Sequence, residues 1–232
     1  MELKNKKIGF CITSAFGEFE NIISQMKEIL KEEASILPIM SYNAYEKDSR
    51  FGKAIDYIKK IEELTGNKII HSIEGAEPIG PKKLTDIMII APCTGNTLAK
   101  ISLGISDTPV TMAAKSHLRN NNPLVIAPST NDGLSGNAEN LGRLLNRKNC
   151  YFVPFKQDNP ITKPNSIVSD FRYIKKTLEY ALDKEQIQPI LLWIFWKNRE
   201  YVFFYSFLYS KLKANIFLFF IKKYWQRTYV RI

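Results

Sequence analysis

The 232-residue sequence lacks the short motifs that identify the common nucleotide-binding and metal-binding folds. It contains no Walker A loop, and no GxGxxG follows its first apolar run, so a P-loop or a dinucleotide-binding fingerprint is not supported. Its three cysteines and two histidines form no CxxC pair and no metal-ligand spacing, so no metal site is predicted. Cysteines without a pairing pattern favour a reducing, cytoplasmic compartment.

The sequence also lacks a run of about 20 apolar residues, so it does not predict a membrane-spanning helix. The basic N-terminus leads into an apolar run that is too short for a signal peptide and is predicted to be the first β-strand. The formal net charge of +10 is unevenly distributed. Eight Lys and Arg residues against one Glu give residues 192–232 a net charge of +7, which leaves +3 for residues 1–191. Because the excess charge lies in this tail, no nucleic-acid partner is predicted.

Residues 192–232 differ in composition from the rest of the chain. They contain all three tryptophans but no Gly, Pro or Asp, and Lys211 and Lys213 interrupt their aromatic runs. Three interpretations are open: an amphipathic anchor on a membrane surface, a partner-binding extension, or an accidental reading-frame extension in an AT-rich gene. The third accounts for the abundance of Phe, Tyr, Lys, Ile and Asn, which A/T-only codons encode. Residues 1–191 are therefore predicted to form the domain, with residues 192–232 outside it.

Within residues 1–191, continuously apolar segments alternate with segments of helical periodicity. The apolar segments do not alternate with polar residues, which is typical of parallel strands buried on both faces. Short connections between alternating strands and helices predict a doubly wound, three-layer α/β sandwich around a parallel sheet. Strands are predicted at residues 7–13, 34–40, 86–92, 123–128 and 150–154, and helices at 19–30, 50–66, 96–106, 109–119, 137–147 and 166–183.

Small and hydroxyl-bearing residues follow four of the predicted strands. In an open parallel sheet, ligands bind outside the carboxyl ends of the strands. Hydroxyls and unpaired N–H groups at helix N-termini favour an anion, so these loops predict a site for a phosphorylated or otherwise anionic planar ligand. Any one such loop also has an ordinary reading as a helix N-cap. The four segments are TSAFGEFE from residue 13, SYNAYEK from residue 41, CTGNT from residue 93 and STNDGLSGN from residue 129.

The third of these loops, residues 93–97, carries the strongest signal. Gly95 lacks a Cβ at a place where a flat ligand can approach, and Asn96 can both donate and accept hydrogen bonds. Cys93 lies where a helix N-terminus would lower a thiol pKa, although packing beneath a ring is its favoured role. The third loop is therefore predicted to contribute the centre of the ligand site.

The segment APCTGNTLAKISLGISD, residues 91–107, resembles a signature of the flavoprotein family that includes flavin-dependent cysteine decarboxylases and phosphopantothenoylcysteine decarboxylase. That signature reads A-P-x-[ST]-x-N-[TS]-x-x-K-x-x-x-G-x-x-D. Over about residues 5–191, the chain more closely resembles the family of dipicolinate synthase B subunits from endospore-forming bacteria, notably in the segments that begin IAPCTGNT and KNCYFVPF. The tail has no counterpart in that family.

The resemblance implies a flavodoxin-like or Rossmann-like sandwich of the FMN-binding type. It further implies an oxidoreductase subunit in the mother-cell cytoplasm that works with a dipicolinate synthase A subunit during sporulation. The pair would oxidise dihydrodipicolinate to dipicolinate, a pyridine dicarboxylate, with NAD(P) held by the A subunit, and the chain would be part of a homo- or hetero-oligomer. The cofactor-binding candidates are Thr13 and Ser14 in the first loop, Ser41 in the second, and Thr94, Gly95, Asn96 and Thr97 in the third.

Two departures from the decarboxylase pattern argue against a flavin-dependent cysteine decarboxylase. Pro78 stands where those relatives have a His, and their substrate motif A-P-x-M-N reads APSTN here, with Thr130 in place of Met. Thr130, Asn131 and Asp132 are therefore the weaker, substrate-binding candidates. Asp132 would bind or deprotonate a substrate, and its Asp-Gly context is equally typical of a turn.

Two hypotheses of different classes are open for the whole chain. The first is an enzyme subunit with a flavin or dicarboxylate pocket, and the second is a non-catalytic scaffold that stabilises the A subunit. Another FMN-binding enzyme of the same family is a further alternative. No catalytic base is identified, because His71 and His117 are predicted to be ordinary surface or core residues. The nearest basic residues for two carboxylates are Lys100, Lys115 and Arg119.

Overall fold

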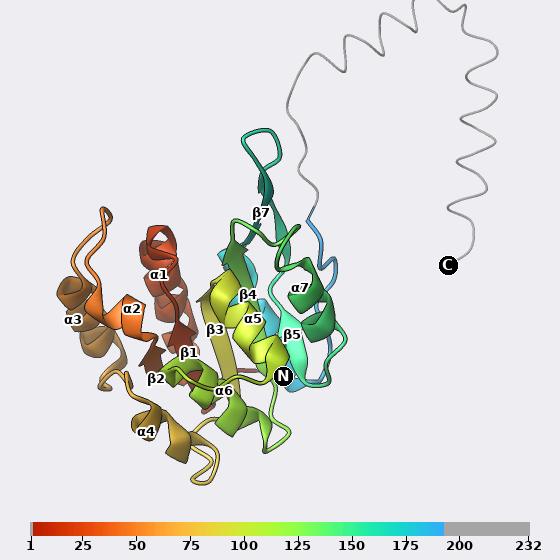
Figure 1. The fold of residues 1–232 in the computed structure, drawn as a ribbon. Helices are drawn as coiled ribbons and strands as arrows, with labels where there is room; N and C mark the ends of the chain where they lie inside the picture. Colours follow the sequence, from red (N-terminus) through yellow and green to blue (C-terminus); the bar gives the residue numbers. More distant parts are fainter. Residues whose placement is uncertain (1, 193–232) are drawn as a thin grey trace, which may run out of the picture. The chain divides into compact units, whose positions relative to one another are not determined.

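The computed structural model describes residues 2–192, which form a mainly parallel β-sheet with helices on both faces (Figure 1). This arrangement confirms the predicted α/β class. Apart from Leu192, the residues on which the three interpretations of the tail depend lie outside the described part of the chain. Within residues 2–192, no helix has the length and apolar character needed to cross a membrane.

Five parallel strands form the body of the sheet in the order β2-β1-β3-β4-β5. The three central strands are almost completely buried along their length, because helices cover both faces of the sheet. This explains the continuously apolar segments of the sequence. All five strands lie within about two residues of their predicted positions: β1 Lys7–Ile12, β2 Ser35–Met40, β3 Ile87–Cys93, β4 Leu124–Thr130 and β5 Cys150–Phe152.

Ile70 adds one more parallel pairing at the outer edge of β2, which the sequence did not predict. Its N–H donates to the Pro38 carbonyl and its own carbonyl accepts from the Met40 N–H, both at 2.9 Å. With Ile70 as an edge strand, the first three parallel strands along the chain (β1, β2 and Ile70) are added in one direction across the sheet. The next three (β3, β4 and β5) are added in the other direction, starting beside β1. The strand order therefore reverses between β1 and β3, which is where ligands bind in doubly wound sheets.

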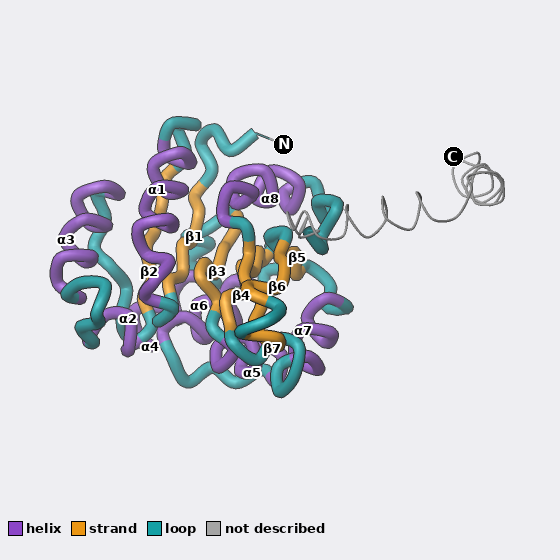
Figure 2. The backbone as a smooth tube through the Cα atoms, turned by 90° about the horizontal axis from the view of Figure 1, so that it is seen from above, coloured by secondary structure: helices purple, strands orange, loops and turns teal. Residues whose placement is uncertain are grey.

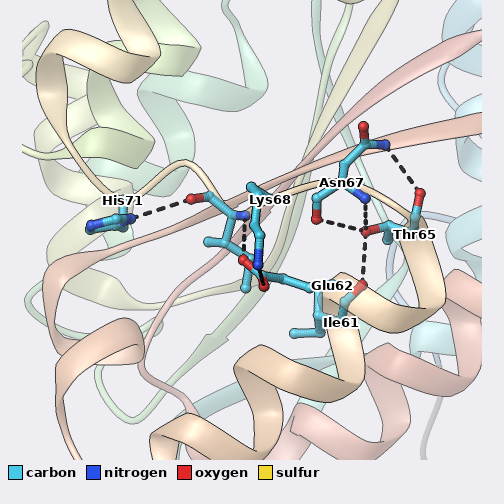
Figure 3. Close-up of polar contacts among 7 residues, drawn as sticks. Ile61, Glu62, Thr65, Asn67, Lys68 and His71 are labelled. Atoms are coloured by element: carbon cyan, nitrogen blue, oxygen red, sulfur yellow. Dashed lines mark hydrogen bonds and ion pairs between the residues drawn. The ribbon is translucent and has the colours of Figure 1, made fainter.

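Polar contacts at the end of α3 hold this edge segment in place (Figure 3). Helix α3, Ala54–Thr65, ends at Gly66 with a positive φ of 67°, as the sequence predicted. Glu62 accepts from Lys68 Nζ at 2.6 Å and from the backbone N–H of Ile69 at 3.1 Å. Asn67 Nδ2 donates to the Ile36 carbonyl of β2 at 2.8 Å. The loop that follows α3 is thus attached both to its own helix and to the sheet.

Helices pack on the sheet in two groups, one on each face, and each group has its own apolar core (Figure 2). The first group includes α1 Phe19–Leu30, α3 and α8 Ile174–Leu182. The second includes α4 Ile73–Ala76, α5 Gly95–Leu103, α6 Pro109–Leu118 and α7 Ala138–Leu145. Helix α2, Tyr42–Glu46, and α4 were not predicted from the sequence, because each is too short to show a periodic pattern.

An antiparallel hairpin extends the sheet beyond β4 and corrects two predictions. Strands β6, Phe155–Asn159, and β7, Lys163–Ser169, pair with each other, and β7 also pairs with the end of β4. The sheet is therefore not wholly parallel, and the predicted helix 166–183 was wrong in its first half, since α8 begins at Ile174. Three prolines between residues 154 and 164 obscured the strand pattern in the sequence.

The packed chain continues past α8 to the last described residue. The side chain of Gln186 donates to the Phe152 carbonyl at 2.8 Å and accepts from the Phe152 N–H at 2.7 Å. Phe155 then pairs with this segment through its N–H to Ile190 and its carbonyl to the N–H of Leu192. Backbone pairing therefore reaches Leu192, one residue past the predicted domain boundary at residue 191.

Both histidines make contacts with neighbouring side chains or backbone within the fold. The exposed ring of His71 stacks on Tyr45 at a centroid distance of 3.9 Å. His117 in α6 is almost fully buried, with Thr85 Oγ1 2.8 Å from Nδ1 and the Pro123 carbonyl 3.0 Å from Nε2. The carbonyl accepts from Nε2–H, so Nδ1 of the neutral ring accepts from the Thr85 hydroxyl. Burial lowers the pKa of His117 from 6.5 to about 4.

We expect His117 to make the protein less stable in mild acid. The folded state favours the neutral ring, so this contribution is complete above pH 6.5 and is lost as the pH falls towards 4. The loss between pH 7 and pH 5 is about 2 kcal/mol. Urea unfolding at the two pH values should show a fall larger by about this amount in the wild type than in His117→Gln. Equal falls in the two proteins would contradict the assignment.

Candidate functional site

The four predicted ligand loops lie along one edge of the sheet, at the carboxyl ends of four neighbouring strands. Strands β1 and β3 are adjacent, with β2 beyond β1 and β4 beyond β3. The first and third loops flank the point where the strand order reverses, and the second and fourth lie on either side of them. The fold therefore brings together loops that begin as far apart in the sequence as residues 13 and 129.

The buried hydroxyl of Thr13 joins the first loop to the third. Thr13 Oγ1 donates to the Pro92 carbonyl at 2.7 Å and accepts from the Thr94 N–H at 3.0 Å. The residue is 1% exposed, and its only hydroxyl proton is used within the protein. Thr13 was predicted to bind the cofactor, and the structure places it beneath the loops, where it sets their spacing.

The N-terminus of α5 leaves hydrogen-bond donors without an acceptor in the described part of the chain at this edge, and Asn96 is the exposed residue of its first three. Thr94 is its N-cap, but the Thr94 side chain caps no backbone N–H and donates instead to Thr97 Oγ1 at 3.3 Å. The first N–H groups of a helix have no intrahelical acceptor, so the first turn of α5 retains free donors. Asn96 is exposed in this turn and its side chain has no hydrogen-bond partner among residues 2–192. The positive end of the helix and these donors favour an anion here.

Gly95 has a different role from the one predicted. A Cβ at this position would lie 2.5 Å from Thr130 Oγ1, 2.6 Å from Asn137 Nδ2 and 2.7 Å from Asp132 Oδ1. The space that a side chain would occupy is therefore filled by polar groups of the fourth loop and not left open for a ligand. Gly95 allows the third and fourth loops to pack directly against each other.

The fourth loop is built around the carboxylate of Asp132. Thr130 Oγ1 donates to one carboxylate oxygen at 2.5 Å and Asn137 Nδ2 donates to the other at 2.7 Å. Asn137 is buried and accepts in turn from Asn140 Nδ2 at 3.0 Å, and Asn140 accepts from the Ser102 hydroxyl of α5 at 2.6 Å. Asn137 ends the predicted fourth loop segment and begins the predicted helix 137–147, but nothing in the sequence singled it out as a site residue. A chain of polar side chains therefore fixes Asp132 next to Gly95.

The remaining predicted residues lie at the same edge. Ser14 is half-buried in the loop after β1, and Asn131 is exposed beside Asp132. Ser41 is the N-cap of α2 and accepts the Ala44 N–H at 3.4 Å, while its own N–H donates to the Ile12 carbonyl of β1 at 3.0 Å. Ser41 therefore acts as a helix cap whose hydroxyl proton is available to a ligand.

Cys93 is completely buried at the end of β3. Burial raises the pKa of its thiol, and Cys11 on the neighbouring strand is buried with a raised pKa as well. The thiol therefore stays protonated near neutral pH and is no nucleophile. This agrees with the packing role that the sequence favoured.

The basic residues predicted to hold two carboxylates do not reach these loops. Helix α5 begins at the carboxyl edge, directly after β3. Helix α6 begins after the α5–α6 connection and ends just before β4, which starts at the opposite edge. Lys115 and Arg119 are in the last turn of α6 and directly after it, and therefore lie near that opposite edge. Lys100, late in α5, is paired with Asp107 at 2.8 Å. The candidate residues at this edge therefore offer helix N–H groups, neutral polar side chains and the Asp132 carboxylate.

A hollow of about 320 Å³ opens beside this edge, between the start of α1 and the base of the hairpin. Glu18 and Asn21 line one side, and Lys156, Asp170 and Arg172 line the other. Arg172 pairs with Asp170, and this contact lowers the pKa of the Asp170 carboxyl. None of the ten predicted binding residues lines this hollow. It has both signs of charge and does not select an anion.

Comparisons with known proteins concern the family and the fold. Residues 1–168 match the family model described as Flavoprotein. The B subunit of dipicolinate synthase from Bacillus subtilis (strain 168) is 45% identical over 190 residues, which are 82% of this chain and 95% of that protein. The crystal structure of the dipicolinate synthase B subunit from Bacillus halodurans C matches with a TM-score of 0.77 at 39% identity, covering 84% of this chain and 100% of that chain.

A more distant match concerns the fold alone. The crystal structure of Burkholderia xenovorans DmrB in complex with FMN has a TM-score of 0.58 at 18% identity, and covers 78% of this chain and 97% of that one. The similarities to the two dipicolinate synthase proteins, by contrast, extend through nearly all of the described residues. They confirm that the predicted resemblance is not limited to the signature segment.

Proposed function

This chain belongs to the Flavoprotein family, and from that premise we propose that it is the B component of a two-component dipicolinate synthase. The observation that carries the proposal is its similarity to the B component of that enzyme, along nearly the whole length of the related protein. In the proposed role it acts with an A subunit in the cytoplasm of the sporulating mother cell, within a hetero-oligomer. The reaction is the oxidation of dihydrodipicolinate to dipicolinate.

The proposed reaction aromatises a dihydropyridine ring. One carbon loses a hydride to NAD(P)⁺ held by the A subunit, which becomes NAD(P)H, and a second ring position loses a proton. The B chain is proposed to bind and orient a flat anionic molecule at the edge formed by its four loops. The absence of a lysine or arginine among the ten candidate residues supports recognition by N–H donors and amides at this edge.

FMN fits the residues at this edge. FMN supplies a flat redox-active ring and a phosphate when bound. The free N–H groups at the start of α5 suit a phosphate, and the exposed Asn96 amide suits the polar rim of a ring. We propose that Ser14, Ser41, Thr94, Asn96 and Thr97 contact the cofactor, while Thr13 and Gly95 position the loops. Thr130, Asn131 and Asp132 are proposed to face the substrate.

Mixing the two purified components tests the proposed function. With dihydrodipicolinate and NAD(P)⁺ supplied, the mixture should form dipicolinate and NAD(P)H at least tenfold faster than either component alone. Full turnover by the A subunit alone would contradict a two-component enzyme. Stimulation by a B chain that holds no flavin, even after reconstitution, would instead support the scaffold alternative.

A change that adds a negative charge at the loop edge is the second arm of this test. Asn96→Asp places a carboxylate in the first turn of α5, where it stabilises the helix but repels an anionic ligand. The variant should keep its unfolding free energy and lose at least tenfold in flavin affinity, measured by fluorescence. Asn121→Asp carries the same change in charge near the opposite edge of the sheet and should bind normally. Equal flavin affinity in both variants would remove Asn96 from the site.

A further inference from the structure

A second hollow, of about 340 Å³, lies near the other edge of the sheet from the ligand loops. It is formed where α5 and α6 end, and Arg147, just after α7, closes it. Ile101 and Ala114 form a buried apolar floor, and the side chain of Leu118 adds an apolar wall. Its lining therefore comes from three different helical segments that converge at one point.

The charges around this hollow are all positive. Lys115, Arg119 and Arg147 line it, and no Asp or Glu does. Within residues 2–192, none of the three forms an ion pair. Three like charges without a counter-ion repel each other, so an anion bound among them would lower the electrostatic energy of the folded protein.

The three cations approach the hollow from two sides. Helix α5 packs against α6 on one side and against α7 on the other. Lys115 and Arg119 therefore come from the α6 side and Arg147 from the α7 side. A ligand with two separated anionic groups can contact both sides, and the apolar floor suits the flat face of a ring. Inorganic phosphate would use the charges but not the floor.

Stabilisation of helix ends accounts for only part of this arrangement. Cations near the C-terminus of a helix interact with its dipole. Arg147 does so, because one guanidinium N–H donates to the Ile101 carbonyl at 3.0 Å. Lys115 instead donates to the Ser106 hydroxyl at 3.3 Å, and the Arg119 side chain has no hydrogen bond within residues 2–192. Arg147 keeps its other guanidinium N–H groups, so all three cations have donors available for a ligand.

We propose that this hollow is a second binding site, for a small planar aromatic dicarboxylate. The identity of the ligand rests on the proposed function, because a pyridine dicarboxylate is the product of that reaction; the position of the site rests on the hollow itself. Arg119 and Lys115 hold one carboxylate, and Arg147 holds the other. The ring lies on Ile101 and Ala114.

Titration of the full chain with pyridine-2,6-dicarboxylate tests the site. Calorimetry should detect binding, and Arg119→Gln and Arg147→Gln should each weaken it about tenfold or more, as expected for the loss of a charge-assisted hydrogen bond. Arg143→Gln is the matched control, because Arg143 lies on α7 outside the hollow and pairs with Glu139. It should bind like the wild type. Pyridine-2-carboxylate, with one carboxylate, should bind at least tenfold more weakly.

Several outcomes would overturn this inference. They are the absence of dicarboxylate binding, equal weakening by the control variant, and equally tight binding of inorganic phosphate. Loss of affinity for the A subunit in the two arginine variants, with dicarboxylate affinity unchanged, would identify a protein-docking surface instead. An active enzyme that binds no dicarboxylate in the hollow would refute this inference and leave the proposed function intact. Dicarboxylate binding that depends on Arg119 and Arg147, without any dipicolinate synthesis, would refute the proposed function and leave this inference intact.

Discussion

Replacement of Thr13 by Val is expected to lower the free energy of unfolding by about 3 kcal/mol, because two buried polar groups lose their partner. Val has nearly the shape of Thr, so packing is retained. The Pro92 carbonyl and the Thr94 N–H, however, would both lose the Thr13 hydroxyl. The loops after β1 and β3 would then separate, and flavin affinity should fall at least tenfold. Urea unfolding and flavin fluorescence measure the two effects.

Thr13→Ser is the matched control for this change. Serine retains the hydroxyl and removes only a methyl group, so its cost should be about 1 kcal/mol and flavin affinity should stay within a few-fold of the wild type. Similar losses in the Val and Ser variants would mean that the methyl group, not the hydroxyl, matters at this position. That result would refute the role of Thr13 as the link between the two loops.

Gly95→Ala should also cost about 3 kcal/mol, for a steric reason. The new Cβ would lie within 2.7 Å of polar atoms of Thr130, Asp132 and Asn137. These side chains are short and hydrogen-bonded to one another, so they cannot move aside without breaking the network around the Asp132 carboxylate. The third and fourth loops must therefore shift apart, and we expect flavin binding to fall together with stability.

Gly142→Ala provides the comparison for Gly95→Ala. Gly142 lies within α7, and nothing lies within 4 Å of a Cβ placed on it. Alanine favours a helix over glycine, so this variant should gain about 0.5–1 kcal/mol of stability. Thermal or urea unfolding of both variants should show a lower free energy of unfolding for Gly95→Ala and a higher one for Gly142→Ala. A stabilising Gly95→Ala would show that the fourth loop does not pack on Gly95.

The location of the candidate site was predictable from the sequence, but the roles of its residues were only partly so. Small and hydroxyl residues after four buried strands indicated that these loops share one edge of the sheet, since parallel strands end at the same edge. Which hydroxyls turn inward was not predictable. Thr13 and Thr94 look alike in the sequence, yet one is buried beneath the loops and the other lies half-exposed at a helix N-terminus.

For the basic residues, nearness in the sequence did not predict nearness in the fold. Lys115 and Arg119 are close to the third loop in the sequence, and on that basis they were expected near the ligand. A helix advances about 1.5 Å per residue, so α5 and α6 carry the chain far from the loop within a few turns. Arg147, which joins them in the second hollow, is separated from Arg119 by a strand and a helix and has no signal of its own in the sequence.

By itself, the sequence determined the class of fold, five of the seven strands and the edge of the sheet at which the four polar loops lie. These follow from local patterns, because burial on both faces requires continuous apolar runs and each helix requires its own apolar stripe. Only the tertiary structure decided the contacts between segments distant along the chain. The Thr13 link to Thr94, the fourth loop against Gly95, the pairing of β7 with β4 and the gathering of three cations all depend on how helices and strands pack, which no local pattern records.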